Sequence, residues 1–273
     1  MLEADPRRLA ESLLDWWALS GVDIADARAA MRAPPPAPAA APPPNAPVAR
    51  PVLRATPTAA PPASTAIDDA RAAAASAKTL AELRAAIEAF EGCALKKTAR
   101  TTVFSDGVED AEIMLVGEAP GKDEDEQGKP FVGRSGQLLD RMFGSIGLSR
   151  QTNLFISNVI FWRPPGNRPP TQGELAACLP FIRRAIEIKA PKLLVFVGGV
   201  AAQTMLARDT GVMRMRNKRL TYSGPNDAAV NAMVMLHPAY LLRRPQEKRL
   251  AWTDLLMMED WLAELGIPRG ERI

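Results

Sequence analysis

The stretch VGEAPGKDEDEQGKPFVGRSG, residues 116–136, combines four consecutive acidic side chains with closely spaced glycines and prolines. Carboxylates at this density could bind a divalent cation, and the glycines could form a phosphate cradle. The residue order excludes two known phosphate loops, because neither G-x-G-x-x-G nor a Gly-Lys-Ser/Thr ending is present. The acidic spacing does not match an EF-hand. Taken alone, the acidic run is either a metal site or a solvated turn, and Pro120 and Gly121 favour a tight turn.

Two further side chains could bind a flat ligand. Phe131 follows Gly128 and Pro130, which stiffen the chain before it, so its ring could be a stacking platform. The alternative is an ordinary core phenylalanine. Asn158 ends an apolar run, and its amide offers an acceptor and two donors in one plane, which suits the edge of a nucleobase. The alternative for Asn158 is capping of the local backbone.

The chain has one histidine, so any step that needs an imidazole must use His237. It follows another apolar run, and a purely structural histidine is the alternative. Basic side chains gather in the loop WRPPGNRPPT and in the segment RRPQEKR. We expect them to contact a phosphate backbone, with a solvated basic surface as the alternative. The candidates are Arg163, Arg168, Arg243, Arg244 and Lys248.

Short apolar runs alternate with helical patterns along the second half of the chain. This alternation predicts an α/β fold with a mostly parallel sheet that is covered on both faces. Sites in such sheets form at the carboxyl ends of strands, so the acidic stretch, Asn158 and His237 are expected to meet there. The predicted strands are residues 113–116, 154–159, 193–197 and 232–236, and the predicted helices are 79–90, 136–143, 172–188, 200–208 and 247–265.

Composition divides the chain into three parts. Residues 1–32 contain a short amphipathic helix, predicted over 6–20, which could dock on a partner or fold back onto its own domain. Residues 33–64 are rich in proline and alanine and are expected to be a disordered linker. The folded domain is predicted to span residues 65–273.

The bulk properties set further limits. A net charge of +3 and a pI near 9.0 are compatible with a polyanionic partner but do not require one. The chain has no apolar run long enough to span a membrane and no apolar stretch of a secretory signal at its start, so we expect a cytoplasmic protein. Two cysteines are too few for a disulfide scaffold. A monomer is expected.

Three segments together resemble a known family. GEAPGKDEDEQGKPFVGRSGQLLD, SNVIFWRPPGNRPPT and HPAYLL are similar to the motifs of type 4 uracil-DNA glycosylases, in the same order. The resemblance covers about residues 90–265. It implies a three-layer α/β/α fold and hydrolysis of the N-glycosidic bond of deoxyuridine in DNA, the first step of base excision repair.

The resemblance also assigns roles to single residues. Phe131 resembles the aromatic residue that stacks on the base, Asn158 the amide that binds the uracil edge, and His237 the histidine that hydrogen-bonds uracil O2. The first motif, whose backbone and carboxylates line the pocket, contains Glu118, Ala119 and Glu124. Either carboxylate could position the attacking water. The remaining acidic residues of the run are then mostly solvated.

The implied reaction is consistent with elementary chemistry. A base must leave the duplex to be reached, and an uncharged leaving base becomes an anion that a donor can stabilise. After His237, the segment YLL could supply an apolar wedge that fills the stack, with Leu241 as the candidate and a core role as the alternative. Two other functions stay open: a glycosylase for hypoxanthine or other deaminated bases, and a protein that binds uracil-containing DNA, single- or double-stranded, without turnover.

The family usually carries an iron–sulfur cluster on four cysteines. Here two of the four positions hold Cys93 and Cys178, whereas Phe90 and Trp162 stand at the other two. Because such clusters use four thiolates, we predict that no iron–sulfur cluster is bound. The two aromatic side chains are expected to fill the space by apolar packing, with the cysteines close together and reduced.

Overall fold

The computed structural model describes residues 63–224 and 229–272. Within them, a six-stranded sheet has the order β1-β3-β2-β4-β6-β5. Strands β3, β2, β4 and β6 are parallel, while β1 and β5 pair antiparallel at the two edges. The strands are β1 Ser105–Gly107, β2 Ile113–Gly117, β3 Leu154–Asn158, β4 Leu193–Val197, β5 Leu220–Ser223 and β6 Ala229–Met235. The predicted mostly parallel sheet is confirmed.

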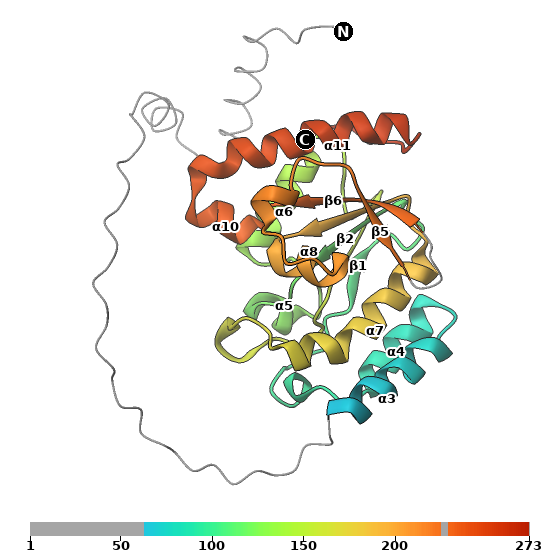
Figure 1. Ribbon diagram of the computed structural model, residues 1–273. Coiled ribbons are helices and arrows are strands. Elements are labelled where there is room, and N and C mark those ends of the chain that lie inside the picture. The colour runs from blue at the N-terminus through green and yellow to red at the C-terminus, as the bar shows by residue number, and fades with distance from the viewer. Residues whose placement is uncertain (1–62, 225–228, 273) are drawn as a thin grey trace, which may run out of the picture.

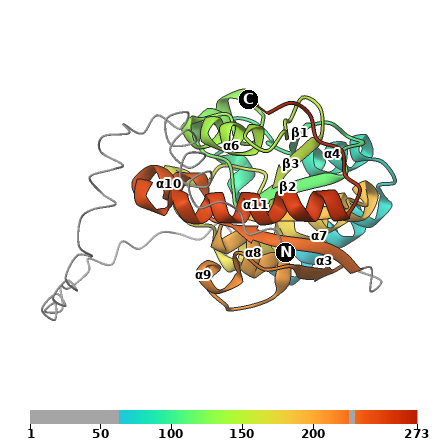
Figure 2. The same ribbon diagram turned by 90° about the horizontal axis from the view of Figure 1, so that it is seen from above.

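Helices cover both faces of the sheet (Figures 1 and 2). Alternate residues of β2 point to opposite faces, as the pleat requires. Ile113 and Leu115 join the core beneath α6, α10 and α11, whereas Met114 and Val116 join the core formed with α3, α4, α7 and α8. The helices are α3 Ala63–Ser76, α4 Leu80–Ala89, α5 Lys122–Gln127, α6 Arg134–Gly144, α7 Gln172–Lys189, α8 Gly199–Leu206, α9 Val212–Met215, α10 Pro238–Arg243 and α11 Lys248–Glu264. This is the expected three-layer arrangement.

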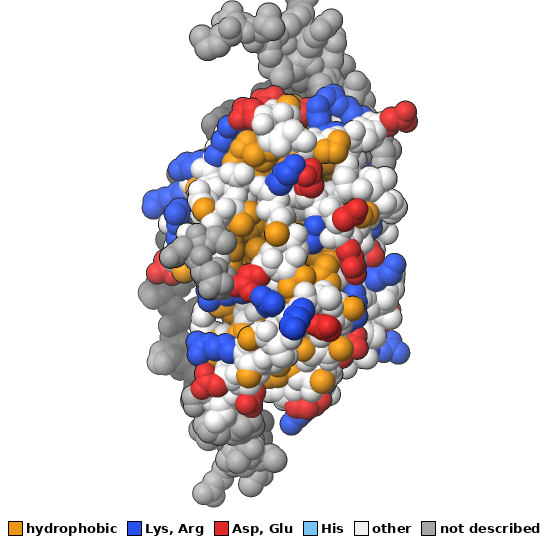
Figure 3. Space-filling model, turned by 90° about the vertical axis from the view of Figure 1, so that its right-hand side faces the viewer, with side chains coloured by type: hydrophobic (Ala, Val, Ile, Leu, Met, Phe, Trp, Pro, Cys, Tyr) orange, Lys and Arg blue, Asp and Glu red, His pale blue; other side chains and the backbone are white. Residues whose placement is uncertain are grey.

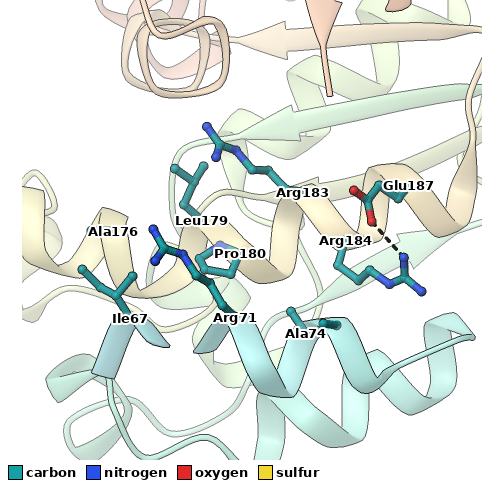
Figure 4. Close-up of a pocket in the computed structure, with 10 residues that line it drawn as sticks. Ile67, Arg71, Ala74, Ala176, Leu179, Pro180, Arg183, Arg184 and Glu187 are labelled. Atoms are coloured by element: carbon teal, nitrogen blue, oxygen red, sulfur yellow. Dashed lines mark hydrogen bonds and ion pairs between the residues drawn. The ribbon is translucent and has the colours of Figure 1, made fainter. Parts of the chain in front are cut away.

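Helix α3 was not predicted, and it extends the described domain to residue 63. It packs along α7, where Ile67 and Ala74 face Leu179 and Pro180 across a shallow groove (Figure 4). Arg184 of α7 donates to the carbonyl of Ala77 at 2.7 Å, which fixes the end of α3 against α7. The predicted helix over residues 6–20 and nearly all of the linker lie outside the described residues.

Local signals explain where the helices begin. Thr79 and Thr171 cap α4 and α7, since each hydroxyl accepts the N–H of a glutamate three residues later. The segment predicted as an acidic turn is instead the short helix α5, which ends at Gly128 in the left-handed conformation.

No helix in the described part of the chain is long and apolar enough to cross a membrane. Figure 3 shows a mixed surface of charged and apolar side chains on one side of the molecule.

Candidate active site

A pocket of about 450 Å³ opens at the carboxyl ends of the parallel strands. The three segments singled out in the sequence converge there, as predicted. Its lining includes Glu118 after β2, Asn158 at the end of β3, and His237 after β6. The other lining residues are Ala119, Pro120, Gly121, Glu124, Phe131, Ser135, Pro164, Asn167, Arg168, Pro169, Ala239 and Arg243. The parallel sheet therefore brings together, in one pocket, side chains that are far apart in the sequence.

Asn158 is buried, with 1% of its surface exposed. Its Oδ1 atom has no hydrogen-bond partner among the described residues. A buried amide oxygen without a partner is costly, so this atom is ready to accept a hydrogen bond from a ligand. In the register of β2 and β3, Asn158 lies opposite Gly117. A Cβ atom on Gly117 would lie 2.4 Å from Oδ1 of Asn158 and 2.5 Å from the ring of Phe131, so only glycine fits.

Phe131 is both buried and part of the pocket wall, so the two alternatives of the sequence analysis coincide. Its ring centroid lies 5.6 Å from that of His237, with 31° between the planes. The backbone of Phe131 has a φ of 54°, in the left-handed region that residues other than glycine seldom adopt. The ring is therefore held at the pocket by an unfavourable backbone conformation that its surroundings must stabilise.

His237 caps helix α10 with its ring. Its Nδ1 atom accepts the N–H of Ala239 at 3.1 Å. Burial, and then the positive charge of Arg243, lower the pKa of His237 to about 4. The ring is therefore neutral near pH 7, and because Nδ1 accepts, the single ring proton is on Nε2. The site thus offers an uncharged N–H donor.

The two candidate carboxylates have different environments. Glu124 is buried, and its carboxylate accepts the N–H groups of Val132 and Gly133 at 2.9 Å and of Gly121 at 3.0 Å. Glu118 lies in the pocket wall, and burial is the cause that raises its pKa. Glu124 therefore joins α5 to the start of α6, while the carboxylate of Glu118 remains available to a ligand or water.

The rest of the acidic run is divided between surface and core. Asp123 and Glu126 are exposed, as expected. The expectation of a solvated side chain was wrong for Asp125, which is 3% exposed and accepts the N–H groups of Arg100 at 2.8 Å and Thr101 at 3.3 Å. The described residues contain no cluster of three or more His, Cys, Asp or Glu side chains that could hold a metal ion.

The basic candidates differ in their exposure to solvent and in the partners that their side chains already have. Arg243 and Arg244 are exposed, and Arg243 also lines the pocket. Arg168 is exposed but forms a two-pronged ion pair with Glu174 at 2.7 and 2.9 Å. Arg163 is partly buried and donates to Oδ1 of Asn167 at 2.7 Å.

Two predicted DNA contacts do not fit the structure. Lys248 is only 3% exposed at the start of α11, so its side chain is buried and is not available to contact a phosphate backbone. Leu241 is fully buried in the core with α6 and α11, so it cannot reach into a base stack. The adjacent Leu242 is 37% exposed. The wedge assignment to Leu241 was therefore wrong, because the first turn of α10 directs that side chain inward.

Comparison with known proteins agrees with the pocket. The family model of the uracil DNA glycosylase superfamily matches residues 104–256. The chain belongs to the uracil DNA glycosylase superfamily. It is 41% identical over 159 residues to a type-4 uracil-DNA glycosylase of Archaeoglobus fulgidus, covering 56% of this chain and 78% of that protein. It is 35% identical over 185 residues to that of Pyrobaculum aerophilum, covering 65% and 92%.

A third relative is the type-4 uracil-DNA glycosylase of Thermotoga maritima, 33% identical over 177 residues, covering 64% of this chain and 90% of that protein. The superfamily match begins at residue 104, so α3 and α4 precede it. It includes all of the pocket residues described above. The resemblance noted in the sequence is confirmed.

The cluster expected for this branch of the glycosylase superfamily does not fit the donors present. Cys93 and Cys178 are buried free thiols, and a hydrogen bond from Cys178 lowers the pKa of Cys93. The predicted proximity of the two cysteines is therefore confirmed. Phe90 packs edge-on against Phe181, with ring centroids 5.1 Å apart. Trp162 is 1% exposed in the same core as both cysteines.

The ring nitrogen of Trp162 donates to the hydroxyl of Thr102 at 3.1 Å, which satisfies its one polar atom. Neither aromatic side chain can ligate iron, and two thiols are half of the set that a cubane or rhomboid cluster uses. The sequence expectation that Phe90 and Trp162 pack as apolar residues here is confirmed. The absence of bound iron stays a prediction.

Two glycines that pack against residues of this glycosylase pocket, and one serine in its wall, were not among the predicted site residues. Gly117 ends β2 and Gly198 follows β4 directly behind the pocket wall, and a glycine directly after an apolar run was the available signal. Gly198 has a φ of 101°, and a Cβ there would lie 3.2 Å from that of His237. Ser135 lines the pocket, at the start of α6. It lies within the first motif, but nothing in that motif distinguishes it from its neighbours.

Proposed function

We propose that this protein is a uracil-DNA glycosylase that hydrolyses the N-glycosidic bond of a flipped-out deoxyuridine. One observation carries the proposal: the buried, unpartnered Oδ1 of Asn158 opens into the same pocket as the neutral ring of His237. Uracil shows a donor, N3–H, beside acceptors, and these two side chains supply an acceptor and a donor. Superfamily membership and the names of the relatives support this assignment.

Selectivity against cytosine follows from Asn158. Its Oδ1 accepts N3–H of uracil while its amide N–H₂ donates to O4. Cytosine has an acceptor at N3 and a donor at N4, so both groups of the buried amide would be mismatched. A site built to hydrogen-bond one edge rejects the wrong edge strongly, because buried polar groups are left unpaired.

Bond cleavage requires stabilisation of two opposite charges. The sugar develops oxocarbenium character, as in other glycoside hydrolyses, and the leaving uracil becomes anionic. The Nε2–H of His237 donates to O2 as negative charge develops there, and a neutral donor does so without transferring its proton. The carboxylate of Glu118 faces the cationic sugar, holds the attacking water and accepts its proton as the bond from C1′ to the water oxygen forms. Glu124 is assigned no chemical step, because its oxygens already accept three backbone N–H groups.

DNA reaches the site past the basic loops. Arg243 and Arg244 contact the phosphate backbone beside the pocket mouth, and Arg163 and Arg168 do so from the loop after β3. Leu242, which is exposed, fills the space that the flipped base leaves. Single-stranded and double-stranded substrates are both accepted. The protein acts as a cytoplasmic monomer, and residues 6–20 bind a protein partner.

A uracil-release assay tests the proposal. The purified protein is incubated with single-stranded and U·G-containing oligonucleotides, and abasic sites are cleaved and counted at several salt concentrations. Base release is expected with uracil and not with cytosine. A protein that leaves every uracil substrate intact overturns the proposal. Tight binding without release would identify the non-catalytic alternative, and release of hypoxanthine but not uracil the altered-range alternative; the relatives' names favour neither.

A further inference from the structure

The stacking residue Phe131 sits on strained backbone that something outside the pocket must hold. Its φ of 54° is in the left-handed region. Directly behind it, helix α6 begins so close that a Cβ on Gly136 would lie 1.9 Å from the carbonyl oxygen of Phe131. The peptide after Phe131 therefore packs directly against the first turn of α6, in a space that only a glycine at position 136 leaves open.

That carbonyl oxygen accepts a hydrogen bond from Nη2 of Arg150 at 2.7 Å. Nη1 of the same side chain donates to the preceding carbonyl, that of Pro130, at 3.0 Å. Arg150 thus holds the two consecutive peptides on either side of the strained Cα atom. Arg150 is not among the residues that line the pocket, so its influence on a ligand must pass through Phe131.

The guanidinium of Arg150 is itself held on two sides. Nε and Nη2 donate to Oδ1 of Asp140 on α6, at 3.0 and 2.8 Å. Nη1 donates to Oδ2 of Asp106 on β1 at 2.9 Å. With 9% of the side chain exposed, these charge-assisted bonds are poorly screened. The planar fork of arginine can make all of them at once, whereas the single ammonium of lysine cannot.

We infer that Arg150 is a positioning residue for base recognition: with Asp106 and Asp140 it clamps the Phe131 backbone so that the ring presents its face to the flipped base. The inference rests on the proposed function for its catalytic consequence, but the clamp itself is a property of the fold. Loss of the clamp lets the backbone of Phe131 relax toward a commoner conformation and turns the ring away from the pocket.

Four variants separate positioning from general stability. Arg150→Met removes the clamp, and Arg150→Lys keeps the charge without the fork. Asp140→Asn weakens the ion pair between Arg150 and Asp140. Because the Asp140 side chain is 46% exposed, this variant replaces the first two if they fold poorly. Arg141→Met is the matched control, since Arg141 is an exposed arginine on α6 that donates to Gln137 and not to the Phe131 segment.

The first readout does not depend on activity. The eight phenylalanines are labelled with fluorine, and the Phe131 resonance is identified by its loss in Phe131→Leu. We expect this resonance to shift or broaden in Arg150→Met and Asp140→Asn while most others stay in place, and to be unchanged in Arg141→Met. An unshifted Phe131 resonance in a folded Arg150→Met protein overturns the inference, whatever the enzyme does.

The second readout is inhibition by free uracil, which does not depend on the active fraction of a preparation. We expect the inhibition constant to rise about 10-fold in Arg150→Met, the scale of a small misplacement of a contacting group, and to be partly rescued in Arg150→Lys. In a Phe131→Ala background the same Arg150→Met change should have little further effect. Equal effects in both backgrounds overturn the inference, whereas an unsubstituted protein that releases no uracil overturns only the proposed function.

Discussion

Gly117 and Asn158 lie opposite each other on neighbouring parallel strands, so close that a single methyl group on Gly117 would come within 2.4 Å of the Asn158 amide oxygen. The same methyl group would meet the ring of Phe131 at 2.5 Å. One backbone position therefore sets the spacing between the amide proposed to bind the edge of the base and the ring proposed to stack on its face.

Gly117→Ala should therefore distort the pocket by displacing Asn158 and Phe131, although the added methyl group does not itself line the pocket. We expect a fall in kcat/KM for uracil DNA of about 100-fold, because Asn158 and Phe131 must both move. Gly173→Ala, with nothing within 4 Å of the added atom, is the matched control and should keep full activity. Comparable activity of the two variants in the base-release assay would show that the close contact does not matter.

The single histidine allows a direct pH measurement. Its pKa in the fold is about 4, below the ordinary value near 6.5. Between these values the unfolded chain binds more protons, so the contribution of neutral His237 to stability is complete above about pH 6.5 and is lost as the pH falls toward 4. The ring resonance should titrate near 4 in the folded protein. Arg243→Met should raise this pKa, since Arg243 contributes to the lowering; titration of the unsubstituted protein near 6.5 would contradict the assignment.

The two glutamates should separate in function. Glu118→Gln should reduce kcat by about 100-fold or more while the melting temperature changes little, because it removes a charge from the pocket wall. Glu124→Ala should lower the free energy of unfolding by about 1–3 kcal/mol, because buried N–H groups lose their acceptor. Both are measured by base release and denaturant unfolding, with the exposed Glu126→Gln as control. A strong loss of kcat with full stability in Glu124→Ala would reverse these roles.

The two leucines after His237 should also behave differently. Leu241→Ala should cost about 2–5 kcal/mol of stability, as expected for a fully buried leucine. Leu242→Ala should leave stability unchanged and reduce activity on U·A pairs more than on single strands, since a wedge matters only where a stack must be filled. Equal activity of Leu242→Ala on both substrates would exclude it as the wedge.

Metal content is predicted from the four cluster positions. The purified protein should be colourless and contain no bound iron, because Phe90 and Trp162 offer no ligand. Visible absorption and iron analysis, on protein prepared without air, check this. The Cys93→Ser and Cys178→Ser variants should retain base release. Brown protein with bound iron, or loss of colour and activity together on removal of Cys93, would contradict the prediction.

Much of the fold and the site could be predicted because their signals are local or repeated. Buried parallel strands are continuous apolar runs, and their carboxyl ends bring Asn158 and His237 together by topology alone. The motif resemblance then gave each of these residues a role. The strands at the two edges are short and partly exposed, so they lack such a signal, and neither β1 nor β5 was predicted.

The wrong or undecided predictions concern side chains whose direction depends on packing. Nothing in the sequence distinguishes Leu241 from Leu242, and the turn of α10 decides which one is buried. In the sequence, Lys248 belongs to a basic cluster, but the start of α11 directs its side chain into the fold. Likewise Glu118 and Glu124 are both acidic residues of one motif, and only three backbone N–H groups around Glu124 separate them.

The aromatic core around Phe90 and Trp162 has a consequence for how the molecule is made. In this core, aromatic side chains of the polypeptide itself join the end of α4, the loop after β3 and helix α7. If no cluster is bound, as we predict, this corner would assemble without iron delivery or a scaffold protein, and it would contain no sulfide for peroxide to attack. We therefore expect the corner to be complete as soon as the polypeptide has folded, in iron-starved and iron-rich cells alike.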